Sequence, residues 1–324
     1  MSIAVLLTHE RYKQKEMALL LQNKIEIESQ AILEPYLNGF RHDTSGLTFT
    51  SLFMWRNLNH FRYEIINDML CISGINYLEP DQELFIFPPL PKENYEPQQL
   101  SETIDILKDR FREVDRPFKI KLMPIKMIPF FEEAKPGQFV FTPDRDNFDY
   151  VYRREDLVAL KGRKYHRKKN HWNYFMRTFS FEYLSLTEDL IKDCLEFNSR
   201  LLQKKSYTPL EAKLIELEEE AIFECLTNMK KAGYRGGVIR INNQVEAFTI
   251  AGKLHDDTVV VHVEKANAKI RGLYQAINQQ FCKYDCQDAI YINREEDMGL
   301  KNLRKAKSSY RPIKMIEKCD AVLI

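Results

Sequence analysis

The chain has 324 residues, of which 44% are hydrophobic and 29% are charged, as in an ordinary globular protein. This length exceeds the usual size of a single hydrophobic core, so we expect two domains. The formal net charge of +1 excludes a general nucleic-acid coat protein. No apolar run approaches the roughly 20 residues that span a bilayer, and the first apolar stretch is too short for a signal peptide. We therefore expect a cytoplasmic protein that is at most peripheral to the membrane.

The six cysteines are scattered, and no two of them form a CxxC pair. Cys282 and Cys286 lie one helical turn apart, but no nearby histidine or second pair of cysteines completes a zinc site. We therefore expect buried thiols and no metal.

The charge is unevenly distributed along the chain. Residues 1–148 carry 17 Lys and Arg against 22 Asp and Glu, whereas residues 149–324 carry 31 against 25. A polyanionic partner would therefore meet the second half first. We expect an N-terminal unit at 1–146 and a C-terminal unit at 147–324, with the active site in the latter.

The first half shows strand and helix patterns in a definite order. We expect helical structure up to about residue 40, ending near Pro35 and Gly39, and a short apolar helix at 47–57. A longer helix is expected to begin at Ser101 as its N-cap. Its buried residues are expected to be Ile104, Leu107 and Phe111. Strands are expected at 63–66, 69–74, 83–87 and 118–124, with a turn at Asn67 and Asp68 between the first two.

The second half repeats this order of elements. A helix opening at Thr208, with Glu211 in a capping box, is expected to close near Gly233. Further helices are expected at 188–202 and 270–281, and strands at 181–186, 238–241, 244–252, 258–266 and 289–293. Both halves thus read strand, turn, strand, strand, helix, strand, and we interpret them as two copies of one unit. A helix that starts at the end of a central strand directs its free N–H groups into the adjacent crevice, which here brings residues 269–272 to the mouth of a site.

Residues 149–176 are the part of the sequence where cations, aromatics and histidines are most closely packed. A helix from about Leu160 separates them into two faces. The face expected to be buried holds Tyr165, Trp172, Phe175 and Met176. The outward face holds Arg163, Arg167, Asn170 and Tyr174, with Lys164 and His171 at its edge. Either this is a solvated basic face or it is a surface for an anion, and we favour the anion because no carboxylate follows Asp156 until Glu182.

A second informative segment lies at 293–312. If Asp297 caps a helix there, Arg304, Lys307 and Tyr310 lie on its apolar side. Two cations that point inward require an anion. That anion is either an upstream carboxylate of Glu295, Glu296 or Asp297, or the phosphate or carboxylate of a substrate. Tyr310 is a candidate proton donor to a leaving group, or else a core residue.

His262 and Glu264 are expected near the end of the strand at 258–266, on one face by the period-two rule. Either is a candidate base, although each alone is more often a satisfied polar residue. Arg271 and Gly272 are a weak signal for a phosphate-binding loop.

The segments DYVYRREDLVALKGRKYHRKKNHWNYF and YINREEDMGLKNLRKAKSSYRP resemble the bacterial family once catalogued as unknown-function family 2156. That family is similar to the C-terminal catalytic domain of the phosphatidylglycerol lysyltransferases. The resemblance implies an α+β fold of two tandem GNAT-like (acyl-CoA N-acyltransferase) units, as in the Fem peptidyltransferases, each a mixed, largely antiparallel sheet flanked by helices. It also implies a set of residues that line or support the site: Lys164, His166, Arg167, Lys168, Asn170, His171, Glu296, Gly299, Arg304, Lys307 and Tyr310.

We therefore expect a transferase that moves an aminoacyl group from aminoacyl-tRNA, or an acyl group, onto an amine or hydroxyl acceptor. His262, Glu264 and Tyr310 are the expected catalytic residues, and Arg271 and Gly272 join the cations expected to bind the donor. A coenzyme A loop would need several glycines where this chain has Ala266, Ala268 and Gly272, which favours tRNA over acyl-CoA as the cosubstrate. The alternatives are an acyl-CoA-dependent enzyme and a non-catalytic module of the same fold that binds an anion or a lipid headgroup.

Overall fold

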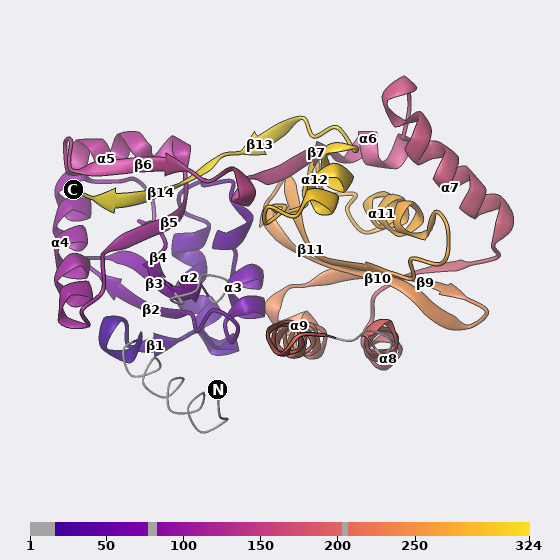
Figure 1. The fold of residues 1–324 in the computed structure, drawn as a ribbon, viewed down its shortest axis with the longest axis horizontal. Coiled ribbons are helices and arrows are strands. Elements are labelled where there is room, and N and C mark those ends of the chain that lie inside the picture. The colour runs from indigo at the N-terminus through magenta and orange to yellow at the C-terminus, as the bar shows by residue number, and fades with distance from the viewer. Residues whose placement is uncertain (1–16, 77–82, 203–206) are drawn as a thin grey trace. The chain divides into compact units, whose positions relative to one another are not determined.

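The computed structural model describes residues 17–76, 83–202 and 207–324. Its contacts divide the chain into two compact units (Figure 1). Unit 1 is the described part of Met1–Arg145 together with Glu317–Ile324, and unit 2 is Asp146–Ile316.

Unit 1 contains a seven-stranded sheet in the order β1-β2-β3-β4-β5-β14-β6. Its strand pairs are antiparallel except for β4 and β5, which are parallel. The strands are β1 (Asn23–Lys24), β2 (Arg62–Ile66), β3 (Met69–Asn76), β4 (Glu83–Ile86), β5 (Lys119–Pro124), β6 (Phe139–Pro143) and β14 (Lys318–Leu323). The α-helices are α2 (Gln30–Leu37), α3 (Phe49–Trp55), α4 (Pro97–Glu113) and α5 (Ile128–Ala134).

Unit 2 contains a second seven-stranded sheet in the order β13-β7-β12-β11-β10-β9-β8. Here β11 and β12 form the parallel pair. The strands are β7 (Asp149–Arg153), β8 (Glu182–Ser185), β9 (Arg235–Ile241), β10 (Gln244–His255), β11 (Thr258–Ala266), β12 (Tyr291–Asn293) and β13 (Lys314–Ile316). The α-helices are α6 (Arg154–Ala159), α7 (His166–Thr178), α8 (Ile191–Leu202), α9 (Pro209–Thr227), α10 (Met229–Ala232), α11 (Leu273–Tyr284) and α12 (Lys301–Ser308).

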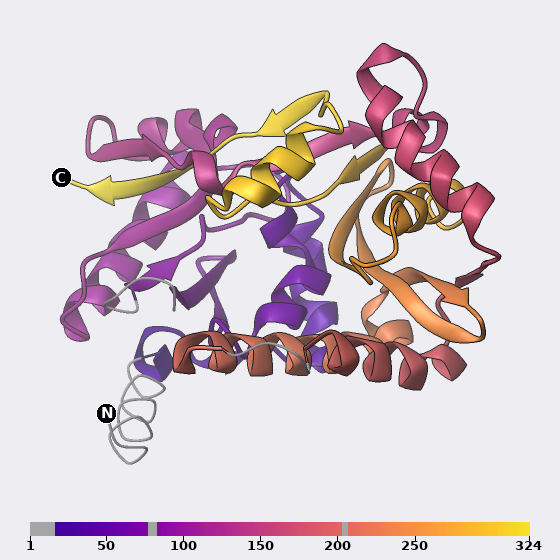
Figure 2. The ribbon, with the colours of Figure 1, turned by 45° about the vertical axis from the view of Figure 1, so that its right-hand side comes forward.

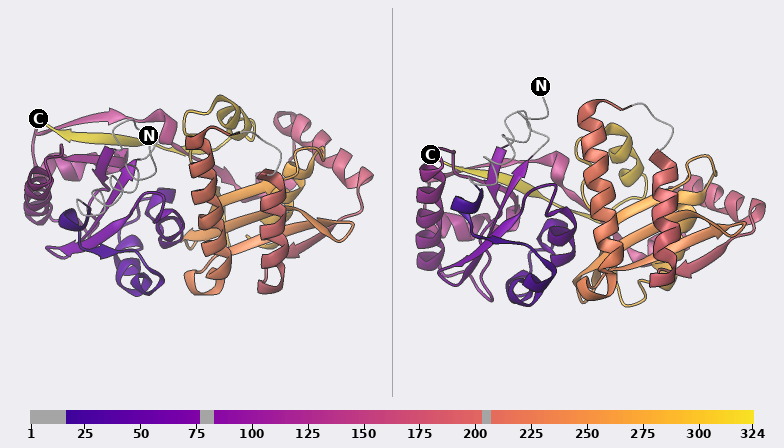
Figure 3. Two further views of the ribbon diagram at one scale, coloured as in Figure 1. Left: turned by 60° about the horizontal axis from the view of Figure 1, so that its bottom comes forward. Right: turned by 90° about the horizontal axis from the view of Figure 1, so that it is seen from below.

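The helices of unit 2 cover both faces of its sheet. Helix α11 lies on one face and packs against α6 and α7 (Figures 1 and 2). Helices α8 and α9 lie beside each other across the opposite face (Figure 3). The side chains of α7 that point inward therefore meet α11 rather than solvent.

The two units repeat one arrangement, as the sequence predicts. In unit 1 the order is β2-β3-β4-α4-β5, and in unit 2 it is β9-β10-β11-α11-β12. In each, the helix connects the two parallel strands, because a parallel pair needs a crossover connection. The expected fold class, two mixed and largely antiparallel sheets flanked by helices, is confirmed.

Several expected local signals are also present. The turns at 67–68 and 242–243 both have positive φ at each central residue, as tight hairpins require. Thr208 caps α9 with Glu211 in a capping box. The expected buried residues of α4 are fully buried, but the helix begins at Pro97 with Glu96 as N-cap, a turn before Ser101.

All six cysteines are buried, and burial raises the pKa of Cys282 to about 12.

The last strand departs from the expected domain limits. The sequence groups residues 147–324 as one unit, whereas β14 is inserted between β5 and β6 of unit 1. Ala321 is fully buried there, and Lys121 contacts both Asp320 (3.4 Å) and Glu83 (2.7 Å). The C-terminal strand therefore completes the first sheet.

The basic helix begins later than expected from the sequence. Helix α6 ends where Leu160 adopts a left-handed conformation, and α7 starts only at His166. Tyr165 and Phe175 are fully buried and Trp172 packs against the core, as predicted. Met176, which was expected to be buried, is 38% exposed, two residues before the end of the helix.

Candidate active site

The candidate site of unit 2 lies where its two parallel strands, β11 and β12, separate. Residues 258–260 of β11 pair with 291–293 of β12, after which the strands no longer pair. β11 continues to Ala266 through a bulge, since Val261 and Val263 pair with adjacent residues of β10 and His262 has no opposite partner in the ladder. The bulge interrupts the period of two on which the shared face of His262 and Glu264 was predicted.

A buried ion pair bridges the separated strands. Nη2 of Arg294 donates to Glu264 at 2.9 Å, and each side chain is only 12% exposed. Asn278 of α11 donates to the other carboxylate oxygen at 3.2 Å. Burial alone would lower the pKa of Arg294, but the Glu264 carboxylate and nearby tyrosines hold it above its ordinary value. Glu264 is thus a buried, oriented carboxylate.

Tyr310 and Lys168 complete this cluster. The Arg294 guanidinium lies 5.1 Å from the centre of the Tyr310 ring, and Nζ of Lys168 lies 4.1 Å from the same centre. Tyr152 also faces Arg294, and its hydroxyl donates to the Lys307 carbonyl at 2.8 Å. Burial raises the pKa of Tyr310, so its hydroxyl stays protonated near neutral pH. Burial, together with the charge of Arg294, lowers the pKa of Lys168 to about 8.

Further cations gather where α7 crosses the start of α11. The guanidinium of Arg271 lies 4.7 Å from the centre of the Tyr174 ring. The pKa of His171 is lowered by burial and by the charges of Arg271, Arg167 and Lys168. In the described part of the chain, none of Arg167, Lys168 and Arg271 forms a salt bridge with a carboxylate. We call Arg167, Lys168, His171 and Arg271 the cationic cluster.

Gly272 brings these two helices together. Its φ is +90°, and a Cβ at this position would lie 2.2 Å from the carbonyl oxygen of His171. Only glycine allows this approach. The sequence predicts Gly272 as part of a phosphate-binding loop, whereas the structure gives it a packing role.

Arg304 is neutralised within the chain. Its guanidinium donates to Asp297 at 2.7 and 2.9 Å and to Asp146 at 2.5 Å. Burial would raise the pKa of Asp297, but hydrogen bonds from Arg304, Tyr150 and the Gly299 amide outweigh it and lower this pKa to about 2. Of the two anions that the sequence allows, the upstream carboxylate is therefore the partner of Arg304, and Asp297 is not the helix cap because α12 starts at Lys301.

Other predicted site residues lie outside the cluster. Lys307 donates to the carbonyl of Glu296, and Gly299 turns the chain beside Asp146. Lys164 forms an ion pair with Asp156 at 3.4 Å, so the basic segment is partly neutralised locally. His166 and Asn170 contact each other at 3.5 Å on the exposed side of α7. His262 bonds Glu295 at 2.8 Å with no exposed side-chain surface.

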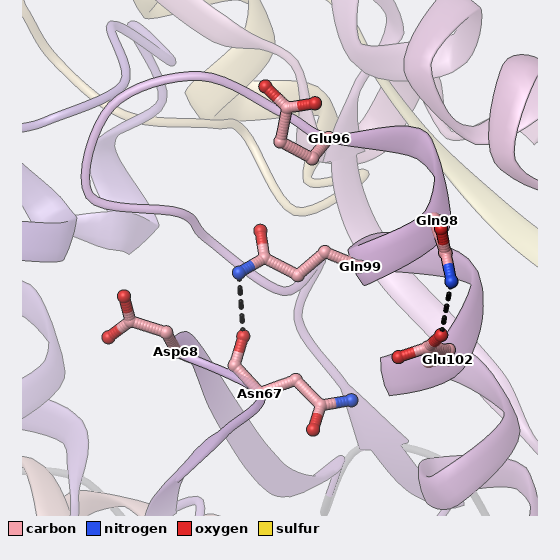
Figure 4. Close-up of a pocket in the computed structure, with 6 residues that line it drawn as sticks. All are labelled: Asn67, Asp68, Glu96, Gln98, Gln99 and Glu102. Atoms are coloured by element: carbon pink, nitrogen blue, oxygen red, sulfur yellow. Dashed lines mark hydrogen bonds between the residues drawn. The ribbon is translucent and has the colours of Figure 1, made fainter.

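Two surface hollows lie elsewhere. One, in unit 1, has a volume of about 640 Å³ and is lined by Asn67, Asp68, Glu96, Gln98, Gln99 and Glu102 (Figure 4). The other, in unit 2, has a volume of about 380 Å³ and is lined by Phe181, Tyr183, Ser185, Gln280 and Tyr284. Neither contains a predicted site residue.

Arg294, Asn278 and Tyr152 join the site without having been predicted from the sequence. A cation directly after a central strand was the one available signal for Arg294. This signal does not identify the partner of Arg294, because Glu264 lies 30 residues away in the sequence.

Two tandem units, each with a helix that crosses between parallel strands of a mixed sheet, define the class of tandem GNAT-like acyltransferase folds. FemX has this fold: its crystal structure is 8% identical to the chain, with a TM-score of 0.59, covering 92% of this chain and 95% of FemX.

Residues 38–321 match the family model described as the C-terminal part of phosphatidylglycerol lysyltransferase, so the chain belongs to that family. The structure of L-PGS from Bacillus licheniformis is 11% identical, with a TM-score of 0.64 and 93% of each chain covered. A conserved protein of unknown function from Bacteroides thetaiotaomicron is 30% identical, with a TM-score of 0.79, covering 93% of this chain and 99% of that chain. Within the described residues, no helix is long and apolar enough to cross a membrane, and no group of His, Cys, Asp and Glu is arranged to hold a metal ion.

Proposed function

We propose that unit 2 transfers an aminoacyl group from a charged tRNA onto an amine or hydroxyl of an acceptor. The observation that carries this proposal is the cationic cluster. Within the described residues, its members Arg167, Lys168 and Arg271 form no salt bridge with a carboxylate. Neighbouring cations repel one another, so an arrangement without internal anions favours binding of an external anion. Phosphates of the donor are such anions, and the family includes a lysyltransferase.

The start of α11 supports tRNA over acyl-CoA as the donor. A pyrophosphate-binding loop exposes the N–H groups at the start of a helix and uses glycines to let the ligand approach. Here the carbonyl of His171 occupies the space beside Gly272, at 2.2 Å from the position of a Cβ. The accessible cations lie instead along α7 and at Arg271, just before α11, where a polynucleotide backbone can extend.

The reaction forms one bond and breaks one. The nucleophile attacks the ester carbonyl carbon, the new amide or ester bond forms, and the bond to the ribose oxygen breaks. The proton of the nucleophile ends on that ribose oxygen. We assign Glu264, oriented by Arg294 and Asn278, as the acceptor of the nucleophile's proton and Tyr310 as the donor to the leaving oxygen, and the proton on Glu264 then returns to the Tyr310 oxygen, which restores both groups. His262 is the second candidate acceptor, through its pair with Glu295.

The test is retention of radiolabelled aminoacyl-tRNA on a filter at low salt, followed by transfer of the label to candidate acceptors. Arg167→Ala removes a cation of the cluster and is expected to weaken retention roughly tenfold, the cost of one charged hydrogen bond. Arg177→Ala is the matched control, because Arg177 is exposed at the other end of α7 and donates only to the carbonyl of Asn173 in its own helix.

Two results would replace this proposal. Tight calorimetric binding of acetyl-CoA or longer acyl-CoA, without retention of any tRNA, would identify an acyl-CoA-dependent enzyme. Retention of tRNA or of anionic vesicles with a steep salt dependence, but with no labelled product, would identify a binding module.

A further inference from the structure

Two cations from distant parts of unit 2 converge on one aromatic ring. Lys168 belongs to α7, and Arg294 follows β12. Their charged groups lie 4.1 and 5.1 Å from the centre of the Tyr310 ring. Arg294 is almost entirely buried, with 12% of its side chain exposed. Both charges therefore lie near one ring, and Arg294 acts on Lys168 from a place that water largely does not screen.

Two polar atoms of the side chains that hold Glu264 have no hydrogen-bond partner in the described part of the chain. They are Nη1 of Arg294 and Oδ1 of Asn278, and both are buried. The other groups of these side chains are used, since Nη2 of Arg294 and Nδ2 of Asn278 both donate to Glu264. A buried donor without a partner is costly, so Nη1 of Arg294 indicates that a further acceptor completes the site, whereas Oδ1 of Asn278 is itself an acceptor and calls for a donor such as water.

The charge of the cluster specifies the kind of group. The Glu264 carboxylate balances Arg294, which leaves Lys168 without an anion. The low pKa of Lys168, about 8, has burial as its first cause and Arg294 as its second. Besides burial, the charges that act on Lys168 are those of Arg294 and Arg167, which lower its pKa, and that of Glu264, which raises it, and the Tyr310 ring lies beside its Nζ. The balance of these groups is positive.

We infer that Lys168 and Nη1 of Arg294 form an inner subsite for a single negatively charged oxygen, separate from the phosphates bound by the rest of the cationic cluster. Two sources supply this chemistry. One is the oxygen of the acyl carbonyl, which becomes an oxyanion when the nucleophile attacks, and this source rests on the proposed function. The other is a carboxylate of a bound ligand. The carbon that bears the oxyanion is tetrahedral, whereas the carbon of a carboxylate is planar.

The titration of Lys168 tests the subsite directly. Lysines of the whole protein are reductively methylated with ¹³C, and the Lys168 resonance is assigned by its loss in Lys168→Met. The midpoint of the Lys168 titration is then measured in chloride buffer, with dimethylphosphinate as a tetrahedral monoanion and with acetate as a planar one. An anion beside Lys168 favours the charged form, so its pKa is expected to rise by about 1 unit or more.

The variants separate the subsite from general ion effects. Lys169 is the adjacent exposed lysine of α7, and its midpoint is expected to stay unchanged. In Glu264→Gln with Arg294→Gln, which removes both charges and, at Arg294, the guanidinium donors, the anion-induced rise at Lys168 is expected to disappear. If that double variant does not fold, Arg294→Lys serves instead, because it keeps the charge but loses the second N–H.

The outcomes are distinct. A larger rise with dimethylphosphinate supports the oxyanion as the source, and an equal or larger rise with acetate supports a ligand carboxylate. A midpoint that neither anion moves, or that moves equally at Lys169, would overturn the inner subsite. Neither probe requires a donor or turnover, so failure of tRNA binding leaves this result unaffected.

Discussion

At the residue scale, the surroundings of Lys168 disfavour its charged form. Its pKa is lowered from 10.5 to about 8 by burial and by Arg294, so the folded protein binds this proton less tightly than the unfolded chain does. Below pH 8 this difference costs stability. As the pH rises from 8 towards 10.5 the unfolded chain still binds the proton while the folded protein has released it, so stability increases across that window.

Lys168→Met is therefore expected to stabilise the protein at pH 7, by on the order of 2 kcal/mol after allowance for partial solvent screening. The advantage over the unsubstituted protein is expected to shrink as the pH approaches 10.5, the value for an ordinary lysine. Urea unfolding in chloride buffer at pH 7 and pH 10 measures it. Lys169→Met, on the exposed side, should change little. A Lys168→Met variant that is less stable at pH 7 would show that the site does not oppose this charge.

At the element scale, the crossing of α7 and α11 holds the cationic cluster together. It depends on Gly272, where an added Cβ would lie 2.2 Å from the His171 carbonyl oxygen and 2.8 Å from Cβ of Phe175. Backbone atoms cannot move aside as a flexible side chain can, so one helix must shift. A shift separates Arg271 from Arg167 and His171.

Gly272→Ala is expected to destabilise unit 2 by about 3 kcal/mol or more, from the left-handed backbone together with overpacking. Gly233→Ala is the matched control: its φ of +78° is also left-handed, but an added Cβ there meets nothing within 4 Å. It should cost only about 1 to 2 kcal/mol. Thermal unfolding compares the two, and equal losses would contradict the close helix crossing.

The elements could be predicted from the sequence far better than the partners of the site. Alternating apolar residues and the turns at 67–68 and 242–243 predict the duplicated unit, because local patterns encode strands and hairpins. The same patterns do not state which charges meet. Arg304 had upstream carboxylates and a substrate as equal candidates, and only the fold selects Asp297. The pair of Glu264 and Arg294 exists because β11 and β12 separate, which no local pattern reports.

At the scale of the whole molecule, the chain contains two similar units, but no single boundary separates them, because unit 1 includes residues from both ends of the chain. The sheet of unit 1 is completed by β14, the last strand, which lies between β5 and β6. Local strand patterns do not specify which sheet a terminal strand joins, and for this reason the expected boundary assigned it to the second unit. Unit 1 can therefore reach its final sheet only after the residues of unit 2 have been synthesised.

Substitutions in β14 are expected to act on unit 1. Ala321 is fully buried, so Ala321→Asp buries an unpaired charge and is expected to cost about 3 kcal/mol or more. Val322 is 37% exposed, so Val322→Asp should be tolerated. Hydrogen exchange would show the loss of protection in β5 and β6 with the first variant, while β10 and β11 stay protected. Equal protection in both variants would mean that β14 does not support this sheet.

The central claim is that the cations where α7 meets α11 bind the phosphates of a donor. The most direct test is the salt dependence of aminoacyl-tRNA binding by Arg271→Ala and by Lys283→Ala. These two cations belong to the start and the end of α11 and lie equally near a tyrosine ring, each at 4.7 Å from its centre. Loss of one phosphate contact should lower the slope of log affinity against log salt by about 0.7 to 1 in Arg271→Ala and leave it unchanged in Lys283→Ala. The same slope in both variants would contradict a donor site at this crossing.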